Sequence, residues 1–222
     1  MLRDSIDYKG TAVGKLFRRF LFPTVMGMVF SAVFIITDGI FVGRGIGSDA
    51  LAAVNLTAPL FTLGTGLGLM FGMGGSVVAS VNLAQGKRRV AQINITQSLF
   101  VPALLIVLLS ALLILCHKPL LLLLGTPPEL MVPAREYLVW FTLFLTPLAV
   151  FNILMFIVRL DGAPNYAMLC NAVPAVINIA LDYVFIFLFG WGMFGAALAT
   201  SLGYVVGAGM ILAYLSRRRN VI

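Results

Sequence analysis

Six long apolar stretches, separated by short polar segments, constrain the fold of this chain most strongly. Each is close to or above the roughly 20 residues that an α-helix needs to cross the hydrocarbon core of a bilayer. They are apolar on nearly all faces, whereas the strands of a membrane barrel alternate apolar and polar residues. With 61% hydrophobic and 10% charged residues, the chain is predicted to be an all-α integral membrane protein with a six-helix bundle. The predicted spans are 16–40, 51–79, 95–116, 133–158, 166–189 and 194–215.

The basic residues predict the orientation of these spans. Residues 1–15 are expected to form a cytoplasmic arm, 16–215 the transmembrane lobe and 216–222 a cytoplasmic basic tail. Twelve of the fifteen lysines and arginines then share the side of the termini, which predicts a multi-pass protein of the plasma or inner membrane with both termini inside. The net charge of +7 is explained by this topology and does not indicate nucleic-acid binding. The three basic residues on the other side are Arg44, Lys118 and Arg135.

Two aspartates interrupt the apolar spans. Asp38 lies near the outer end of the first span, and Asp182 lies in the outer half of the fifth. An ionisable residue at membrane depth costs at least about 2.5–3.5 kcal/mol, so it usually faces a partner or a wet cavity. Asn178 and Asn171 precede Asp182 on the same helical stripe. Two carboxylates in one low-dielectric pocket would hold either a proton or a cation between them.

Neutral oxygens at similar depth complete a hypothetical cation site. The Asn178 carbonyl and the Thr200 hydroxyl suit a hard cation such as Na⁺, and Asn152 offers a further carbonyl. Moving one such charge through the membrane field yields about 2.3 kcal/mol per 100 mV, enough to drive another solute outward. The alternative is structural: Asp38 is solvated at a helix end, Asp182 pairs with a neighbouring Tyr or Asn, and the neutral groups join helices. No cofactor besides the coupling ion, H⁺ or Na⁺, is expected, and the chain is not expected to be an enzyme.

Glycine and proline predict two features of the helices. Gly64, Gly68 and Gly72 recur every four residues, which favours close packing of the second span against another helix. Pro23 lies near the predicted start of the first span. It either bends this helix by removing a backbone hydrogen bond or sits in the first turns, where proline is tolerated.

Three segments resemble the N-terminal lobe of the multidrug and toxic compound extrusion (MATE) family. They are TDGIFVGRGIGSDALAAVNLTAPL (37–60), RLDGAPNYAM (159–168) and NIALDYVFIF (178–187), which resemble the first-loop region, the turn before the fifth helix and the fifth helix itself. The resemblance implies that proton or sodium entry drives export of drugs or other cationic, amphipathic compounds. It also implies a second lobe, because a full transporter of the family has twelve spans in two lobes. The partners would be the solute, the lipid bilayer and either a C-terminal lobe or a second copy of the chain.

The resemblance also assigns roles to individual residues. Asp38, Asn178, Asp182 and Thr200 match the cation site of prokaryotic members. Tyr137 and Asn152 match residues of the fourth helix that line the substrate cavity, and Pro23 matches the proline at which the first helix bends in some members.

Three alternatives stay open on the residues alone. A flippase for lipid-linked saccharides shares this architecture, but a cargo with phosphates favours a basic cavity, and the predicted spans hold acidic residues and no buried Lys or Arg. An intramembrane aspartyl protease also needs two aspartates, but Asp182 follows Ile-Ala-Leu and lacks the GxGD motif. The third alternative is a truncated lobe without independent transport.

Overall fold

The computed structural model describes residues 12–217, so most of the predicted arm (1–15) and tail (216–222) lies outside the described residues. This part of the chain contains helices only, and five of them are long and apolar enough to cross a membrane. A sixth span is a pair of helices with a bend between them. The helices are α1 (Val13–Gly45), α2 (Ser48–Ala84), α3 (Arg88–Leu115), α4 (His117–Leu123), η1 (Pro128–Leu130), α5 (Met131–Leu143), α6 (Leu145–Leu160), α7 (Pro164–Asp182), η2 (Tyr183–Leu188) and α8 (Gly192–Arg217).

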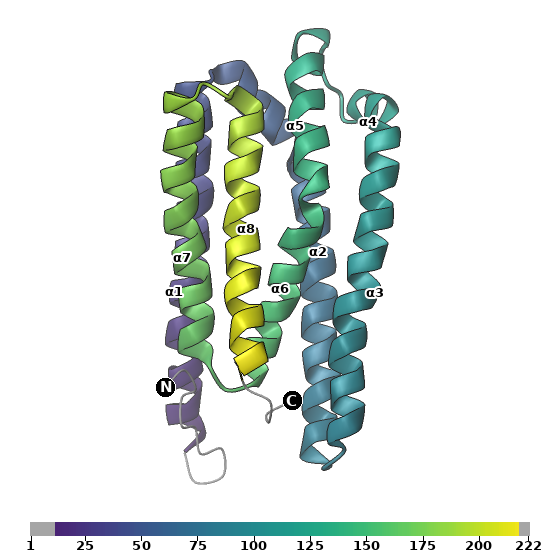
Figure 1. Ribbon diagram of the computed structural model, residues 1–222, viewed down its shortest axis with the longest axis vertical. Helices are drawn as coiled ribbons and strands as arrows, with labels where there is room; N and C mark the ends of the chain where they lie inside the picture. Colours follow the sequence, from purple (N-terminus) through teal and green to yellow (C-terminus); the bar gives the residue numbers. More distant parts are fainter. Residues whose placement is uncertain (1–11, 218–222) are drawn as a thin grey trace.

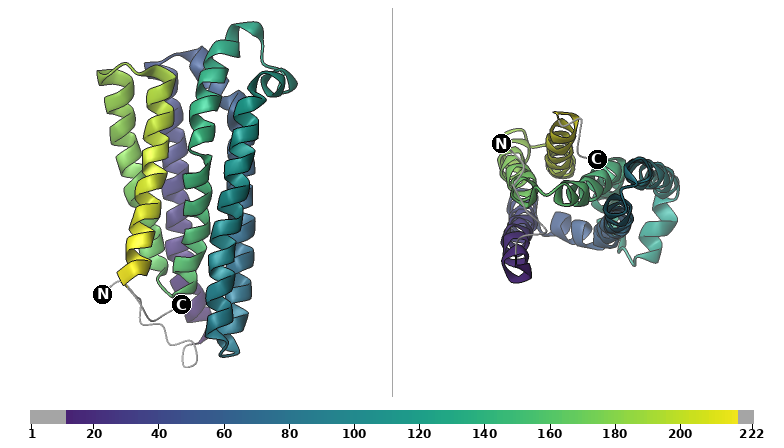
Figure 2. Two further views of the ribbon diagram at one scale, coloured as in Figure 1. Left: turned by 45° about the vertical axis from the view of Figure 1, so that its right-hand side comes forward. Right: turned by 90° about the horizontal axis from the view of Figure 1, so that it is seen from below.

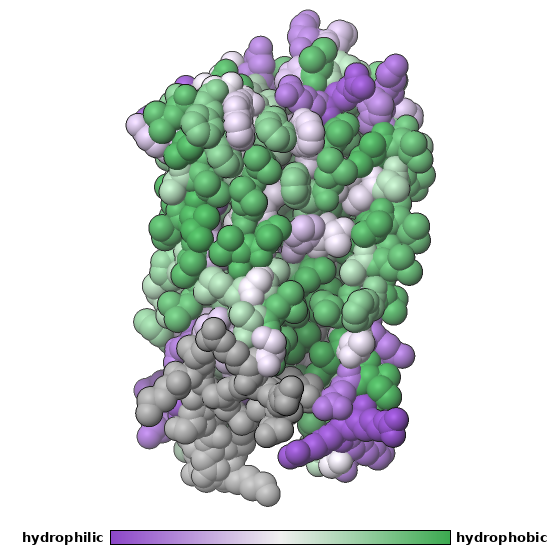
Figure 3. Space-filling view, in the orientation of Figure 1, coloured by the Kyte–Doolittle hydropathy of each residue, from purple (hydrophilic) through white to green (hydrophobic). Residues whose placement is uncertain are grey.

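The long helices run roughly parallel to one another, and α1 begins and α8 ends at the same end of the bundle (Figure 1). Helix α1 packs mainly against α7, and α2 packs mainly against α6 and α3, whereas α1 and α2 touch each other little (Figure 2). A broad hydrophobic band covers the middle of the visible face, and hydrophilic residues gather at the two ends of the molecule (Figure 3). These features confirm the predicted all-α membrane bundle.

The predicted fourth span, 133–158, differs from the structure in being broken. Helices α5 and α6 meet at Phe144 with an angle of 46°. Pro147 explains the position of the break for two reasons. It has no backbone N–H to bond to the carbonyl of Leu143, and its ring clashes with that carbonyl. The backbone N–H of Phe144 instead bonds to Phe141 three residues back, at 3.0 Å.

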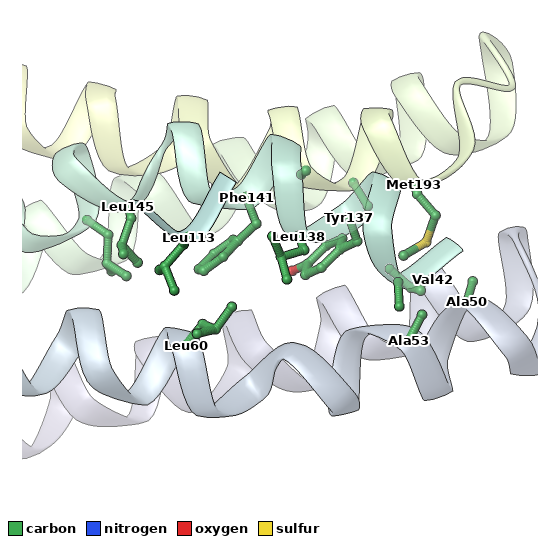
Figure 4. Close-up of a cluster of buried hydrophobic side chains, with 14 of the residues drawn as sticks. Val42, Ala50, Ala53, Leu60, Leu113, Tyr137, Leu138, Phe141, Leu145 and Met193 are labelled. Atoms are coloured by element: carbon green, nitrogen blue, oxygen red, sulfur yellow. The ribbon is translucent and has the colours of Figure 1, made fainter. Parts of the chain in front are cut away.

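A core toward the end of the bundle opposite the start of α1 joins α1, α2, α3, α5, α6 and α8. Tyr137 and Phe141 lie one turn apart on α5 with stacked rings, 5.7 Å between centroids. Leu60 of α2 faces them, and Val42 of α1 and Met193 of α8 close the same cluster (Figure 4). The core therefore holds the two spans that carry Asp38 and Thr200 against the broken helix.

The glycine strip of α2 packs as the sequence predicts. Gly64, Gly68 and Gly72 are all buried. A methyl group on Gly68 would lie 2.9 Å from the Asn152 Cβ and 3.1 Å from the Ala149 carbonyl oxygen of α6. The backbones of α2 and α6 therefore approach more closely than any side chain on this strip would permit.

We expect Gly68→Ala to lower the thermal midpoint of the chain, because overpacking of a tight helix contact costs about 1–3 kcal/mol. Gly66→Ala is the matched control on the same helix, since its new methyl group would meet no atom within 4 Å. Thermal unfolding in one detergent compares the two variants. Equal midpoints would show that α2 and α6 can separate at no cost.

Candidate functional site

Two helices bring Asp38 and Thr200 together. Asp38 lies two turns before the end of α1 and is half-buried, and Thr200 lies two turns into α8 and is buried. The Thr200 hydroxyl donates a hydrogen bond to Asp38 Oδ1 at 3.3 Å. The hydrogen bond joins residues that are 162 positions apart in sequence, and it holds one oxygen of the carboxyl group in place.

Asp182 and Asn178 form the buried side of the same site. They lie one turn apart at the end of α7, and both are fully buried. Neither oxygen of Asp182 and neither polar side-chain atom of Asn178 has a hydrogen-bond partner among the described residues. Asp38 is near enough to Asp182 to act on its charge. Buried polar groups are normally hydrogen-bonded, so this cluster can accept a proton or a small cation.

The cluster offers oxygen donors of the kind that hard cations prefer. Residues 12–217 contain no group of three or more His, Cys, Asp or Glu side chains placed to hold a metal. Two carboxylates, the Asn178 carbonyl and the Thr200 hydroxyl are hard oxygen donors, the type that Na⁺ shares with Ca²⁺ and Mg²⁺.

The helix geometry changes directly after Asp182. Residues Tyr183–Leu188 form the π-helix η2, and the Phe189 N–H bonds to the Val184 carbonyl five residues back. Short π-helical segments are rare in proteins, and those that occur are often found at functional sites. The end of α1 fits closely against η2, because a methyl group on Gly45 would collide with Ile186. The predicted fifth span gave no sign of this segment, since its apolar sequence suits either helix.

Two adjoining cavities lie on the side of Asp38. The first has a volume of about 220 Å³ and is lined by Asp38, Thr200 and Tyr137 among others. The second, of about 180 Å³, is lined by Asn152 and Asn171. Both share Phe34, Ile35 and Phe61 as lining residues, so they are neighbours. The structure therefore brings Tyr137 to the aspartates but places Asn152 one cavity away from them.

Two further predictions concern α1 and α7. Pro23 is buried inside α1, eleven residues from its start, so the alternative of a first-turn proline is wrong. The helix continues from Val13 to Gly45 through this proline, and a functional bend there stays a prediction. On the predicted stripe of α7, Asn178 and Asp182 are buried, whereas Asn171 is half-buried and borders the second cavity.

Arg159 bears on the expectation that the spans hold no buried Lys or Arg. It was expected in the turn after the fourth span, but it belongs to the last turn of α6 and is half-buried. It lines a third cavity of about 440 Å³, which shares Ser31, Thr65 and Asn152 with the second. The sequence did not predict that Arg159 lies within the helix, because no residue before Gly162 indicates where the helix ends.

The sequence also missed the aromatic residues beside the site. Tyr204 of α8 makes an edge contact with Phe34 of α1, at 5.7 Å between ring centroids, and a tilted ring contact with Phe151 of α6, at 5.6 Å. Phe34 lies one turn before Asp38, and this spacing is the one signal that could have placed it near the carboxylate.

Comparison with known proteins decides the family. The MatE family model matches residues 23–184, which include both aspartates and most of the lobe. The chain belongs to the MatE family. Multidrug export protein MepA of Staphylococcus saprophyticus is 30% identical over 219 residues, which cover 97% of this chain and 48% of MepA.

Solved structures of MatE relatives agree with this assignment. An outward-facing multidrug resistance MATE family transporter superimposes with a TM-score of 0.83 at 29% identity, over 91% of this chain and 45% of the transporter. A MATE in the bent conformation gives 0.84 at 29% identity, over 93% of this chain and 46% of that protein. The MatE chain thus spans about half the length of the relatives that it matches.

Proposed function

We propose that this MatE chain is one lobe of a cation-coupled exporter, in which Asp38 and Asp182 bind the coupling ion. The observation that carries the proposal is the meeting of these two carboxyl groups beside Thr200 and Asn178 in a buried pocket. A buried carboxylate without a partner is costly, so the pair favours a state that holds H⁺ or Na⁺. Exchange of that ion for solute would then couple the two fluxes.

The cavity next to Asp38 supports a cationic, amphipathic solute. Tyr137, Phe141 and Phe61 line it together with Asp38, so aromatic faces surround one carboxyl group. Aromatic rings and a carboxylate both attract organic cations. The relatives named multidrug export protein agree with such a cargo, which we extend to this chain as part of the proposal.

The sparse contact between α1 and α2 supports a second lobe. The Asp38 cavity is lined by residues of both helices, such as Phe34 of α1 and Asn55 of α2. We propose that a second lobe, a C-terminal one or another copy of the chain, covers this side and completes the transport pathway. The excess of basic residues at the end shared by α1 and α8 supports a cytoplasmic location for that end.

The proposal is tested by the thermal stability of the purified chain against Na⁺ concentration and pH, with choline chloride holding ionic strength constant. A ligand at 100 times its Kd stabilises the folded state by about 2.7 kcal/mol. We expect a specific gain from Na⁺, or from protons alone, which Asp38→Asn and Asp182→Asn both lose.

Asp49→Asn is the matched control, because Asp49 is an exposed carboxylate in the first turn of α2. It should keep the gain of the unmodified chain. A folded protein whose stability responds to neither Na⁺ nor pH would contradict the cation site and return the aspartates to a structural role.

A further inference from the structure

The third cavity differs in polarity from the site described above. It lies between α1, α2, α6 and α7, on the side of Asn152 and Asn171 away from Asp38, and has a volume of about 440 Å³. Arg159 is the one ionisable side chain among the described residues that line it. The cavity therefore carries positive charge, whereas the cavity at Asp38 carries negative charge.

The N–H groups of the Arg159 guanidinium bond to no described residue, so they are available to a ligand. Its recorded contact is with the ring of Phe156, whose centroid lies 5.6 Å from Cζ. No described carboxylate forms an ion pair with it. Asp161, the nearest acid in sequence, is buried and accepts a hydrogen bond from Tyr214 at 2.5 Å instead. A guanidinium carries five N–H donors, and planar anions bind two of them at once.

Two amide groups border the same cavity, and no described residue donates a hydrogen bond to their oxygens. The Asn152 Nδ2 donates to the Leu148 carbonyl at 3.1 Å, and the Asn171 Nδ2 donates to the Ala167 carbonyl at 3.3 Å. Each amide thus uses one donor on its own helix and keeps its oxygen as an acceptor. These acceptors would serve polar N–H or O–H groups of a ligand whose anionic end is at Arg159.

The three cavities form a series along α1. Gly27 and Ser31 border the third cavity, and Asp38 borders the first. At 1.5 Å per residue, Gly27 and Asp38 are about 16 Å apart along the axis. The series therefore has a basic end, a middle lined by amides and an acidic end.

We propose that the Arg159 cavity is a binding site for the anionic group of an amphipathic molecule: a carboxylate, sulfonate or phosphate on an apolar body. The anion would pair with the guanidinium, and the apolar body would lie against Phe156, Met155 and Leu69, which line the same cavity. This site goes beyond the proposed function, because it needs neither the aspartates nor the coupling ion. Two sources share this chemistry, a free amphipathic anion and the phosphate of a lipid headgroup.

The test measures binding of pyrenebutyrate, a fluorescent amphipathic carboxylate, to the chain in nanodiscs of zwitterionic phosphatidylcholine, which has no net charge, after subtraction of empty nanodiscs. We expect the unmodified chain to bind pyrenebutyrate at least about tenfold more tightly than Arg159→Gln, since one charge-assisted contact is worth that much. Pyrenebutanol has the same rings without the charge, and it should bind the unmodified chain as weakly as pyrenebutyrate binds the variant.

Arg89→Gln is the matched control, because Arg89 is an exposed arginine in the first turn of α3, at the same end of the bundle. It should bind pyrenebutyrate like the unmodified chain. Equal binding by Arg159→Gln and the unmodified chain, an equal loss in Arg89→Gln, or equal binding of pyrenebutanol would each overturn the proposal. The pyrenebutanol comparison needs no variant, so it decides even where Arg159→Gln fails to fold.

A second series in nanodiscs that contain phosphatidylglycerol identifies the source of the anion. The anionic surface of these nanodiscs weakens pyrenebutyrate binding by the same factor for the unmodified chain and for Arg159→Gln. The ratio of the two affinities is therefore independent of this repulsion. A ratio that falls to one means that the headgroup phosphate occupies the Arg159 site. A ratio that stays at about ten means that the site takes free amphipathic anions in preference to lipid.

Discussion

Replacing Asp182 by Asn is expected to make the chain more stable in alkaline buffer without Na⁺. Asp182 is fully buried, and neither of its oxygens has a described hydrogen-bond partner. An uncompensated buried charge costs on the order of 3 kcal/mol. The neutral amide removes that cost, and for a chain of this length the thermal midpoint should rise by roughly 6–12 °C.

The same variant should lose its advantage when the pH falls or Na⁺ is added. If Asp182 binds the coupling ion as proposed, the unmodified chain gains stability by binding a proton or Na⁺, whereas the amide binds neither. Asp38→Asn is a graded control with a smaller gain, because Asp38 is half-buried and already accepts the hydrogen bond from Thr200. An Asp182→Asn chain that is less stable than the unmodified one in alkaline, Na⁺-free buffer would mean that the carboxylate has a structural partner.

Tyr214→Phe is expected to destabilise the chain strongly at the opposite end of the bundle. The Tyr214 hydroxyl donates to Asp161 Oδ2, and both residues are buried. This bond ties the turn between α6 and α7 to the last turns of α8. The other Asp161 oxygen has no described partner, so loss of the hydroxyl leaves the whole carboxylate without one.

A buried hydrogen bond to a charged group is worth about 1.5–3 kcal/mol, which corresponds to a fall of roughly 3–12 °C in the thermal midpoint. Tyr183→Phe serves as the control, because Tyr183 is 53% exposed and should tolerate the loss of its hydroxyl. If Tyr214→Phe and Tyr183→Phe unfold at the same temperature, Asp161 draws its stability from another group.

Hydropathy predicted the spans because every side chain that faces the lipid must be apolar. The helices nevertheless extend beyond the apolar runs, as α2 does from Ser48 to Ala84, since a helix can continue into the polar interface. The break at Phe144 was beyond prediction. Pro147 was visible, but so were Pro59 and Pro102, and these lie inside α2 and α3, which continue through them.

The sequence predicted which residues belong to the candidate site better than it predicted how they are arranged. Depth along the spans placed Asp38 and Asp182 at one level and added the neutral oxygens of Asn178 and Thr200, which the resemblance also assigned to the cation site. Their meeting depends on α1 packing against α7 and α8, which no local pattern encodes. Arg159 was misplaced for a related reason. Burial of a residue at a helix end depends on neighbours that are distant in sequence, here Gly27 of α1 and Asn171 of α7.

The pairing of α1 with α7 has a consequence for biosynthesis. Helix α1 ends at Gly45, and its main partner begins only at Pro164. A ribosome adds about 5–20 residues per second, so α1 enters the membrane on the order of ten seconds before α7 is complete. During that interval Asp38 has neither Thr200 nor Asp182 beside it, because both come later in the chain. The cluster of Asp38, Asp182 and Thr200 is therefore assembled late, and the nascent chain must hold a carboxylate at membrane depth until then.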